Sequence, residues 1–119
     1  MALTTGIITN TGTAPATNLV MNIDNDNLSF SSTVVYHVYV WNSVVSKSLV
    51  YANLLNINAN TSQIINLNIA GNTSYEVQFL VNGQVPTDTV ITVCRNGFIR
   101  KCHSLSKCVE YRTHIHCAA

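Results

Sequence analysis

Residues 94–119 of this chain of 119 residues carry all four cysteines and three of the four histidines. These residues are Cys94, Cys102, His103, Cys108, His114, His116 and Cys117. Thiols form disulfides in oxidising surroundings, and thiolates together with imidazoles are good ligands for Zn²⁺. The C-terminal region therefore offers two kinds of chemistry, covalent cross-linking and metal binding.

The spacing of the cysteines favours cross-linking. The chain has no C-x-x-C pair of the kind found in zinc ribbons and thioredoxin-like proteins. Four thiols can form two internal disulfides in three possible connectivities, or they can pair between subunits. We favour bonds between subunits, because a β domain of this size folds without internal disulfides and a cysteine near a chain end can reach a neighbouring copy. The weaker alternative is a metal site built from Cys102, His103, Cys108 and one of His114, His116 or Cys117.

The same region differs from the rest of the chain in charge. Residues 94–119 hold five Lys or Arg and one Glu, a formal net charge of +4, whereas residues 1–93 hold Lys47 and four acidic residues, a net charge of −3. We therefore expect a β-sandwich body, residues 1–93, and a basic Cys/His-rich tail, residues 94–119. Phe98 and Tyr111 could stack on nucleic-acid bases, but the sequence pI of about 7.7 and the lack of a binding motif predict no nucleic-acid partner.

The body has the periodicity of β-strands. Apolar residues alternate with amides in 62–70 and with Glu76 and Gln78 in 74–82, so each stretch has one apolar and one polar face. The expected strands cover approximately residues 3–9, 16–23, 31–41, 46–56, 62–70, 74–82 and 88–94. The pattern predicts an all-β protein with a single Ig-like or jelly-roll antiparallel β-sandwich. The Cys/His-rich basic C-terminal tail then forms final strands or an assembly arm, with one weak helix candidate at 101–107.

Two local features refine this expectation. Residues 33–41 are apolar on both faces, which is typical of a central strand or of a strand half-buried against a partner subunit. Val35, Tyr39 and Trp41 on its second face are the candidate assembly contacts. Asn82-Gly83 is the preferred dipeptide of a two-residue hairpin turn, because both residues accept a positive φ.

The composition argues against an enzyme. Charged residues make up 9% of the chain, and the carboxylates of the body are scattered along the sequence. General acid–base catalysis by a pair of carboxylates therefore has no support. Neither a nucleophile elbow nor a Gly-rich phosphate loop occurs in the sequence. Asp24–Asn27 lacks the glycine and the distal glutamate of a calcium loop, and it predicts a turn. We therefore expect no enzymatic activity and no cofactor.

The N-terminus and the apolar runs bear on location. Residues 1–6 lack the basic and apolar regions of a signal peptide. No apolar run approaches the roughly 18 residues of a membrane helix. We expect no membrane insertion, and we expect an extracellular or spore-surface protein that is either mature or exported without a conventional signal peptide.

Several short motifs resemble those of known surface proteins. Residues 9–18, Thr-Asn-Thr-Gly-Thr-Ala-Pro-Ala-Thr-Asn, resemble the opening of extracellular β-sandwich domains of the CARDB and related Ig-like type. Residues 6–93 are similar to small spore-surface proteins of endospore-forming bacteria, of the coat, exosporium and endospore-appendage kinds. The motifs that carry this similarity are Thr5–Ile8, Asn22–Asn25, Val38–Asn42, Asn58–Gln63 and Tyr75–Phe79. The resemblance implies a structural component of a coat or fibre.

The tail departs from that resemblance, because proteins of this kind usually finish with a further apolar strand. As it stands, the tail is basic and rich in Cys and His. With suitable codons, residues 101–119 read one base later encode an alternating apolar strand. The coding DNA distinguishes these two tails.

These observations predict a structural subunit that assembles with copies of itself. Sheets normally guard their edge strands with charge, and this body has almost none. Strand addition from Ala2–Asn10 or from the tail onto a neighbouring copy builds a fibre or coat, which disulfides lock and which other coat or surface proteins can join. The alternative is an Ig-like binding or adhesion module for surface carbohydrate or protein, with Tyr36, Trp41 and Tyr51 as a sugar platform.

Overall fold

The computed structural model describes residues 1–10, 17–41, 43, 45–69, 74–96, 101–111 and 114–117. From residue 96 onward it describes the backbone alone, except at Leu105. The strands are β1 (Ala2–Thr4), β2 (Asn18–Asn25), β3 (Ser32–Trp41), β4 (Lys47–Ile57), β5 (Thr61–Asn68), β6 (Tyr75–Gly83), β7 (Thr89–Asn96), β8 (Lys101–Ser104), β9 (Ser106–Tyr111) and β10 (His114–Cys117). A short 3₁₀ helix, η1 (Pro86–Asp88), lies between β6 and β7.

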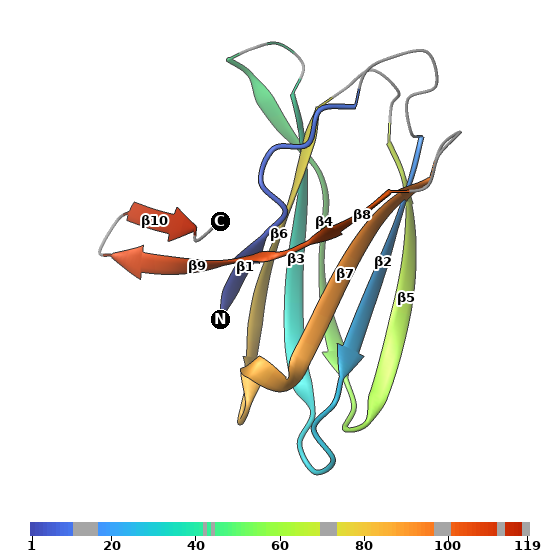
Figure 1. Cartoon of the computed structure of the whole chain (residues 1–119), viewed down its shortest axis with the longest axis vertical. Helices are drawn as coiled ribbons and strands as arrows, with labels where there is room; N and C mark the ends of the chain where they lie inside the picture. Colours follow the sequence, from blue (N-terminus) through green and yellow to red (C-terminus); the bar gives the residue numbers. More distant parts are fainter. Residues whose placement is uncertain are drawn as a thin grey trace.

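These strands form two antiparallel sheets (Figure 1). The six-stranded sheet has the order β10-β9-β1-β6-β3-β4, and the four-stranded sheet has the order β5-β2-β7-β8. The pairing of the body strands is nested, because β3 pairs with β4, β2 with β5 and β1 with β6. Successive pairs alternate between the two sheets, as in a long antiparallel ribbon folded over itself. The prediction of an all-β sandwich is confirmed.

One apolar core fills the space between the sheets. In β3 every second side chain is buried, so Val34, Tyr36, Val38 and Val40 face the core while the intervening residues face outward. The other core side chains are Ile8, Leu19, Met21, Ile23, Ile57, Ile69, Tyr75, Val77, Phe79, Val81, Ile91 and Val93. Burial of each large apolar side chain stabilises the fold by roughly 1.5–3 kcal/mol. The alternation seen in the sequence therefore has a direct energetic cause.

The seven body strands lie close to the predicted ranges, but β1 is much shorter than expected. It ends at Thr4 because Gly6 has a φ of 66°, a left-handed conformation that interrupts an extended strand. Beyond this glycine the chain returns to the sheet only at an isolated bridge between Ile8 and Tyr75. The expected strand at 3–9 is thus replaced by two short contacts with β6. The first is β1 itself, and the second is the bridge from Ile8 to Tyr75, the first residue of β6.

Two further local predictions are wrong. Asn82-Gly83 does not form a hairpin turn, because β6 and β7 lie in different sheets. Gly83 is the last residue of β6, and a Cβ at this position would lie 3.2 Å from the carbonyl oxygen of Ser31, so close approach explains the glycine. Residues 101–107 form β8 and the start of β9, whereas a weak helix was expected there.

The C-terminal strands cover one flank of the sandwich, which we call the covered flank. β8 pairs with β7 in the four-stranded sheet, and β9 pairs with β1 in the six-stranded sheet. Leu105, between them, is half-buried against the core. Figure 1 shows β8 and β9 as one extended run, with the β9–β10 hairpin reaching beyond the body. β1 and β7 consequently have a paired strand on both sides.

Candidate assembly surface

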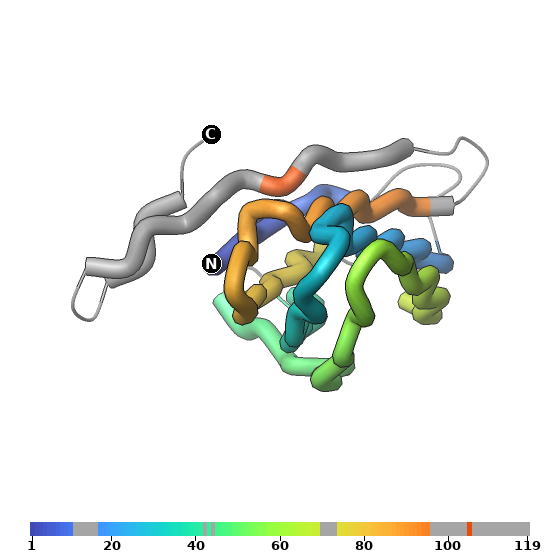
Figure 2. Tube along the Cα trace, turned by 90° about the horizontal axis from the view of Figure 1, so that it is seen from below, coloured from blue at the N-terminus to red at the C-terminus, as the bar shows by residue number. Residues whose placement is uncertain are grey.

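The opposite flank, which we call the open flank, consists of β4 and β5. They are the outermost strands of their sheets on this side, and Figure 2 shows them in green shades at one flank of the body. Among the described strands, β4 pairs only with β3 and β5 only with β2, so each presents backbone N–H and C=O groups outward. β4 is eleven residues long and β5 is eight. From Lys47 to Asn68 the chain has one charged residue, Lys47 itself. Long uncharged edges are templates for the addition of a strand.

Large apolar side chains are exposed on the same two strands. The exposed fraction is 51% for Leu49, 44% for Val50 and 62% for Leu54 on β4, and it is 66% for Ile64 on β5. Grouped exposed apolar side chains are uncommon on monomeric proteins and mark contact surfaces. The open flank is therefore apolar and carries a single charge, Lys47, and both properties favour association.

Polar contacts hold the two edges of the open flank together. Asn25 is 1% exposed, and its Nδ2 donates hydrogen bonds to the carbonyl oxygens of Ile57 at 3.1 Å and Phe30 at 3.0 Å. This side chain anchors the end of β4 next to the turn that leads into β5. Further along the flank, the hydroxyl of Tyr51 donates to the carbonyl oxygen of Asn68 at 2.8 Å. The edges are thus held in place although no strand covers them in the described chain.

The predicted contact residues Val35, Tyr39 and Trp41 lie on the outer face of the six-stranded sheet. Each is half-buried and alternates along β3 with residues of the core. The register places Val35 opposite Leu54 on β4 and opposite Leu80 on β6. We call these five residues the outer patch. It continues the exposed apolar surface of β4 across the sheet, and the described chain does not cover it with a second layer.

A lysine lies across the aromatic part of this patch. The Nζ atom of Lys47 is 4.5 Å from the ring centroid of Tyr39 and 5.6 Å from that of Trp41. The rings of His37 and Tyr39 meet edge to face with centroids 6.1 Å apart. A cation over aromatic rings at an exposed site gains about 0.5–1 kcal/mol. The one charge of the open flank is therefore held against the outer patch.

The cysteines and histidines of the tail are divided between the two sheets. Cys102 and His103 lie on β8 of the four-stranded sheet, and Cys108, His114, His116 and Cys117 lie on β9 and β10 of the six-stranded sheet. Cys94 on β7 is 5% exposed and is disulfide-bonded. Within the described side chains, no group of three or more His, Cys, Asp or Glu is placed to hold a metal ion. The side chains of Cys102, His103, Cys108, His114, His116 and Cys117 lie outside the described ones, so the metal alternative stays a prediction.

The predicted turn at Asp24–Asn27 is only partly present: Asp24 and Asn25 are the last residues of β2, and Asp26 and Asn27 begin the loop to β3. The backbone N–H of Asp26 donates to the carbonyl oxygen of Asp88 at 3.0 Å, and Nδ2 of Asn27 donates to Oδ2 of Asp88 at 3.0 Å. A hydrogen bond with the side chain of Asp26 raises the pKa of Asp24. These polar groups connect the loop to η1, and this contact gives them a structural role.

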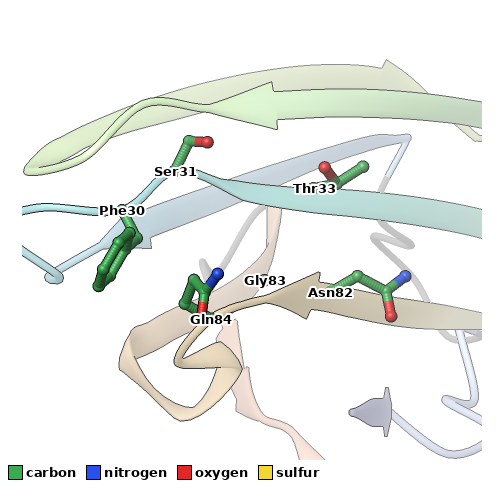
Figure 3. Close-up of a pocket in the computed structure, with 6 residues that line it drawn as sticks. All are labelled: Phe30, Ser31, Thr33, Asn82, Gly83 and Gln84. Atoms are coloured by element: carbon green, nitrogen blue, oxygen red, sulfur yellow. The ribbon is translucent and has the colours of Figure 1, made fainter.

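A cavity of about 550 Å³ lies between the start of β3 and the end of β6 (Figure 3). Its lining consists of Phe30, Ser31, Thr33, Asn82, Gly83 and Gln84. None of these six residues has a titratable side chain. The cavity therefore offers hydrogen-bonding groups but no acid, base or strong nucleophile, and it gives no basis for proposing an enzymatic reaction.

The three aromatics of the alternative sugar platform do not share a face. Tyr36 is 5% exposed and belongs to the core, and Tyr51 is half-buried against the core. Trp41 lies on the outer face, on the other side of the sheet. In the basic tail, Phe98 lies outside the described residues, and for Tyr111 the structure describes the backbone alone.

The sequence pattern did not single out Leu54, Leu80 and Ile64, which the structure shows to be exposed. It identified the strands that carry them but not which of those strands are edges. Two signals were present: strand 46–56 lacks the regular alternation of its neighbours, and charge is absent after Lys47 as far as Asn68. Together these signals describe an edge strand without guarding charges.

Comparisons with protein-family models, with curated proteins and with solved structures find no match to this chain. Within the part of the chain that the structure describes, no helix has the length and apolar character that crossing a membrane requires. The function is therefore argued from the surface geometry and the sequence.

Proposed function

We propose that this protein is a structural subunit that assembles with copies of itself into a fibre or coat by adding strands at the open flank. The observation that carries the proposal is the pair of long edges, β4 and β5, which carry a single charge and exposed apolar side chains such as Leu54 and Ile64. An added strand satisfies the outward backbone groups and removes these side chains from water. The outer patch enlarges the contact beyond the backbone.

The tail strands are better donors than the N-terminal segment, which was the other candidate. Ala2–Asn10 is used by its own fold: β1 pairs with β6, and the backbone N–H of Thr5 donates to the carbonyl oxygen of Val77 at 3.0 Å. β10 and β8, by contrast, are the outermost strands of the two sheets on the covered flank. In the proposed assembly, β10 of one copy pairs with β4 of the next, and β8 pairs with β5. Such a heterologous contact does not close on itself, so it propagates into a fibre.

The strand pairing supports the jelly-roll alternative over the Ig-like one. In an Ig fold the last two strands of the domain lie side by side in one sheet. Here β6 and β7 lie in different sheets, and β7 pairs with β2. The nested pairs β1·β6, β2·β5 and β3·β4 fit the folded ribbon of a jelly roll.

The resemblance of the body to spore-surface proteins supports an extracellular or spore-surface location and other coat or surface proteins as further partners. Low net charge favours association, because it weakens repulsion between copies. Disulfides add durability in this proposal, and their strand positions decide whether they act within or between subunits.

The alternative function is an Ig-like binding or adhesion module. Its expected sugar-binding platform of Tyr36, Trp41 and Tyr51 loses one member, because Tyr36 faces the core. The remaining aromatic surface is formed by Tyr39 and Trp41 with Lys47 across them. A binding module of this kind stays monomeric and retains a carbohydrate or a surface protein.

Negative-stain electron microscopy and sedimentation of the purified protein over a concentration series, without added ligand, separate these two functions. Fibres or sheets that form at micromolar concentration support the structural subunit. Dispersed monomers at every concentration, together with retention on a glycan array, contradict it and support the binding module.

A further inference from the structure

The strand register brings the four cysteines together in two pairs. Cys94 on β7 is opposite Cys102 on β8, and Cys108 on β9 is opposite Cys117 on β10. Directly opposite residues of antiparallel strands have Cα atoms roughly 4.5–5.5 Å apart. A disulfide spans Cα distances of about 4.4–6.8 Å. Both pairs therefore have the backbone spacing that a disulfide needs.

We infer that the chain closes two intrachain disulfides, Cys94–Cys102 and Cys108–Cys117, in place of the bonds between subunits that the sequence alone favours, and that the first fastens β8 over the edge of β7. Each of the other two connectivities joins the four-stranded to the six-stranded sheet through both of its bonds. Facing sheets pack about 10 Å apart, which exceeds the span of a disulfide. Cys94 is in a disulfide in this structure, as every one of the three connectivities requires, so the choice of its partner rests on the register.

The position of β8 explains why a covalent fastening is useful there. β8 has four residues, and its first pair of register positions sets Lys101 opposite Arg95. Like charges at directly opposite positions destabilise a strand pair. This unfavourable pair lies next to Cys94 and Cys102. The Cys94–Cys102 disulfide therefore holds β8, whose pairing with β7 is short and is weakened by the repulsion between Arg95 and Lys101.

Formation of each bond is a two-electron oxidation. Two thiols lose two protons and two electrons and become one disulfide, while a low-molecular-weight disulfide takes up the electrons and protons and is released as two thiols. The bond forms by thiolate attack through a mixed disulfide, so no other reactant is required.

The inferred fastening controls the number of open edges. With Cys94–Cys102 closed, β8 covers β7, and the open flank is the exposed acceptor of strands. With that bond reduced, β8 can leave, and residues 92–95 of β7 become a second acceptor edge for a strand of another copy. This consequence for assembly rests on the proposed function, whereas the connectivity and the fastening do not.

Tryptic mapping of the non-reduced protein tests the connectivity, because cleavage after Lys and Arg places each cysteine on a different peptide. These peptides are 48–95, 102–107, 108–112 and 113–119. In one sample, the free thiols of the isolated protein are alkylated before digestion. In a second sample, equal amounts of ¹⁵N-labelled and unlabelled protein are reduced together and reoxidised by glutathione disulfide before digestion. We expect 48–95 linked to 102–107 and 108–112 linked to 113–119, with no mixed-isotope pairs. Any other pairing, mixed-isotope links or fully alkylated cysteines would overturn the inference.

Amide hydrogen exchange in dilute, dispersed protein tests the fastening. In Cys94→Ala/Cys102→Ala, the amides of residues 92–95 that point toward β8, every second one along the strand, should exchange about 10- to 100-fold faster than in the wild type, because β8 then opens freely. The matched control Cys108→Ala/Cys117→Ala should leave those amides unchanged. Equal protection in both variants contradicts the fastening. Neither experiment depends on assembly, so a failure of the proposed function gives a separate result.

Discussion

The two flanks of the sandwich differ in how their edge strands are covered. On the covered flank, β7 and β1 are each paired with a strand of the basic tail. On the open flank, β4 and β5 carry one lysine and several exposed apolar side chains, and the described chain adds no further strand there. One flank is thus protected by additional chain and the other is left available.

The contrast shows that low charge alone does not determine where a β protein associates. The covered flank is also poor in charge within the body, but its backbone groups already have partners. Exposed backbone groups, exposed apolar side chains and absent charge coincide only on the open flank. An assembly surface is therefore best located by the coincidence of all three properties.

Charges placed on the open flank should have the largest effect. Leu54→Lys together with Ile64→Lys sets a charge on each edge, and a paired strand would have to desolvate both, so the concentration needed for assembly should rise by about 100-fold or more. Sedimentation against concentration measures this change. Val90→Lys is the matched control, because Val90 is also exposed, at 51%, but lies on the interior strand β7. Equal loss of assembly in the control would show that the flanks do not differ.

Removal of the Asn25 side chain, which anchors the end of β4, should cause the largest loss of folding stability. Asn25→Ala leaves the carbonyl oxygens of Phe30 and Ile57 without this donor in a buried place, so the free energy of unfolding should fall by about 2–4 kcal/mol. Urea denaturation measures this loss. Asn22→Ala, an exposed position on the same strand, should change the stability by less than about 0.5 kcal/mol. A small effect at Asn25 would mean that the open flank is held by other contacts.

The core between the sheets should lose stability at alkaline pH because of Tyr75 on β6. This residue is fully buried, its hydroxyl has no partner among the described residues, and burial raises the pKa of its phenol to about 12, partly offset by Arg95. Between pH 10 and pH 12 the unfolded chain loses this proton while the folded chain keeps it, so stability falls as pH rises. The loss should approach roughly 2–3 kcal/mol.

The variant Tyr75→Phe isolates this contribution. Its unfolding free energy should equal or slightly exceed that of the wild type at pH 8, because an unpartnered buried hydroxyl is removed. Near pH 11.5 the variant should be the more stable protein by a wider margin. Parallel pH profiles for the two proteins would show that Tyr75 ionises as easily in the folded chain as in the unfolded chain.

Removal of the single charge from the open flank should have the smallest effect. Lys47→Gln takes the cation off the rings of Tyr39 and Trp41, so folding stability should fall by about 0.5–1 kcal/mol. Assembly should nevertheless begin at about two- to fivefold lower protein concentration, since the flank becomes uncharged. The diagnostic result is that the same substitution lowers folding stability and makes assembly easier. Weaker assembly would mean that Lys47 itself contributes to the contact.

Much of the body could be predicted from local pattern. The alternation in β3 and β6 predicts which side chains enter the core, because a strand places successive residues on opposite faces. It also placed Val35, Tyr39 and Trp41 on a second face, where they do lie. These predictions depend only on residues close in sequence.

Predictions that depended on distant residues were less successful. Asn82-Gly83 predicts a hairpin turn, but its glycine is explained by the close approach of Ser31, which lies in the loop just before β3. The clamp formed by Asn25 was not predicted, because its partners lie up to 33 residues away. The edges and the cysteine pairs depend on strand order and register, which the pattern of a single strand does not encode.

The most direct test is a comparison of amide hydrogen exchange between assembled and dispersed protein. We predict that assembly increases protection in residues 47–68, on β4 and β5, and leaves residues 18–25 and 75–81, on interior strands, unchanged. Protection that appears elsewhere with no change in 47–68 would contradict the claim that the open flank is the assembly surface. Failure to assemble at any concentration would contradict the proposed function itself.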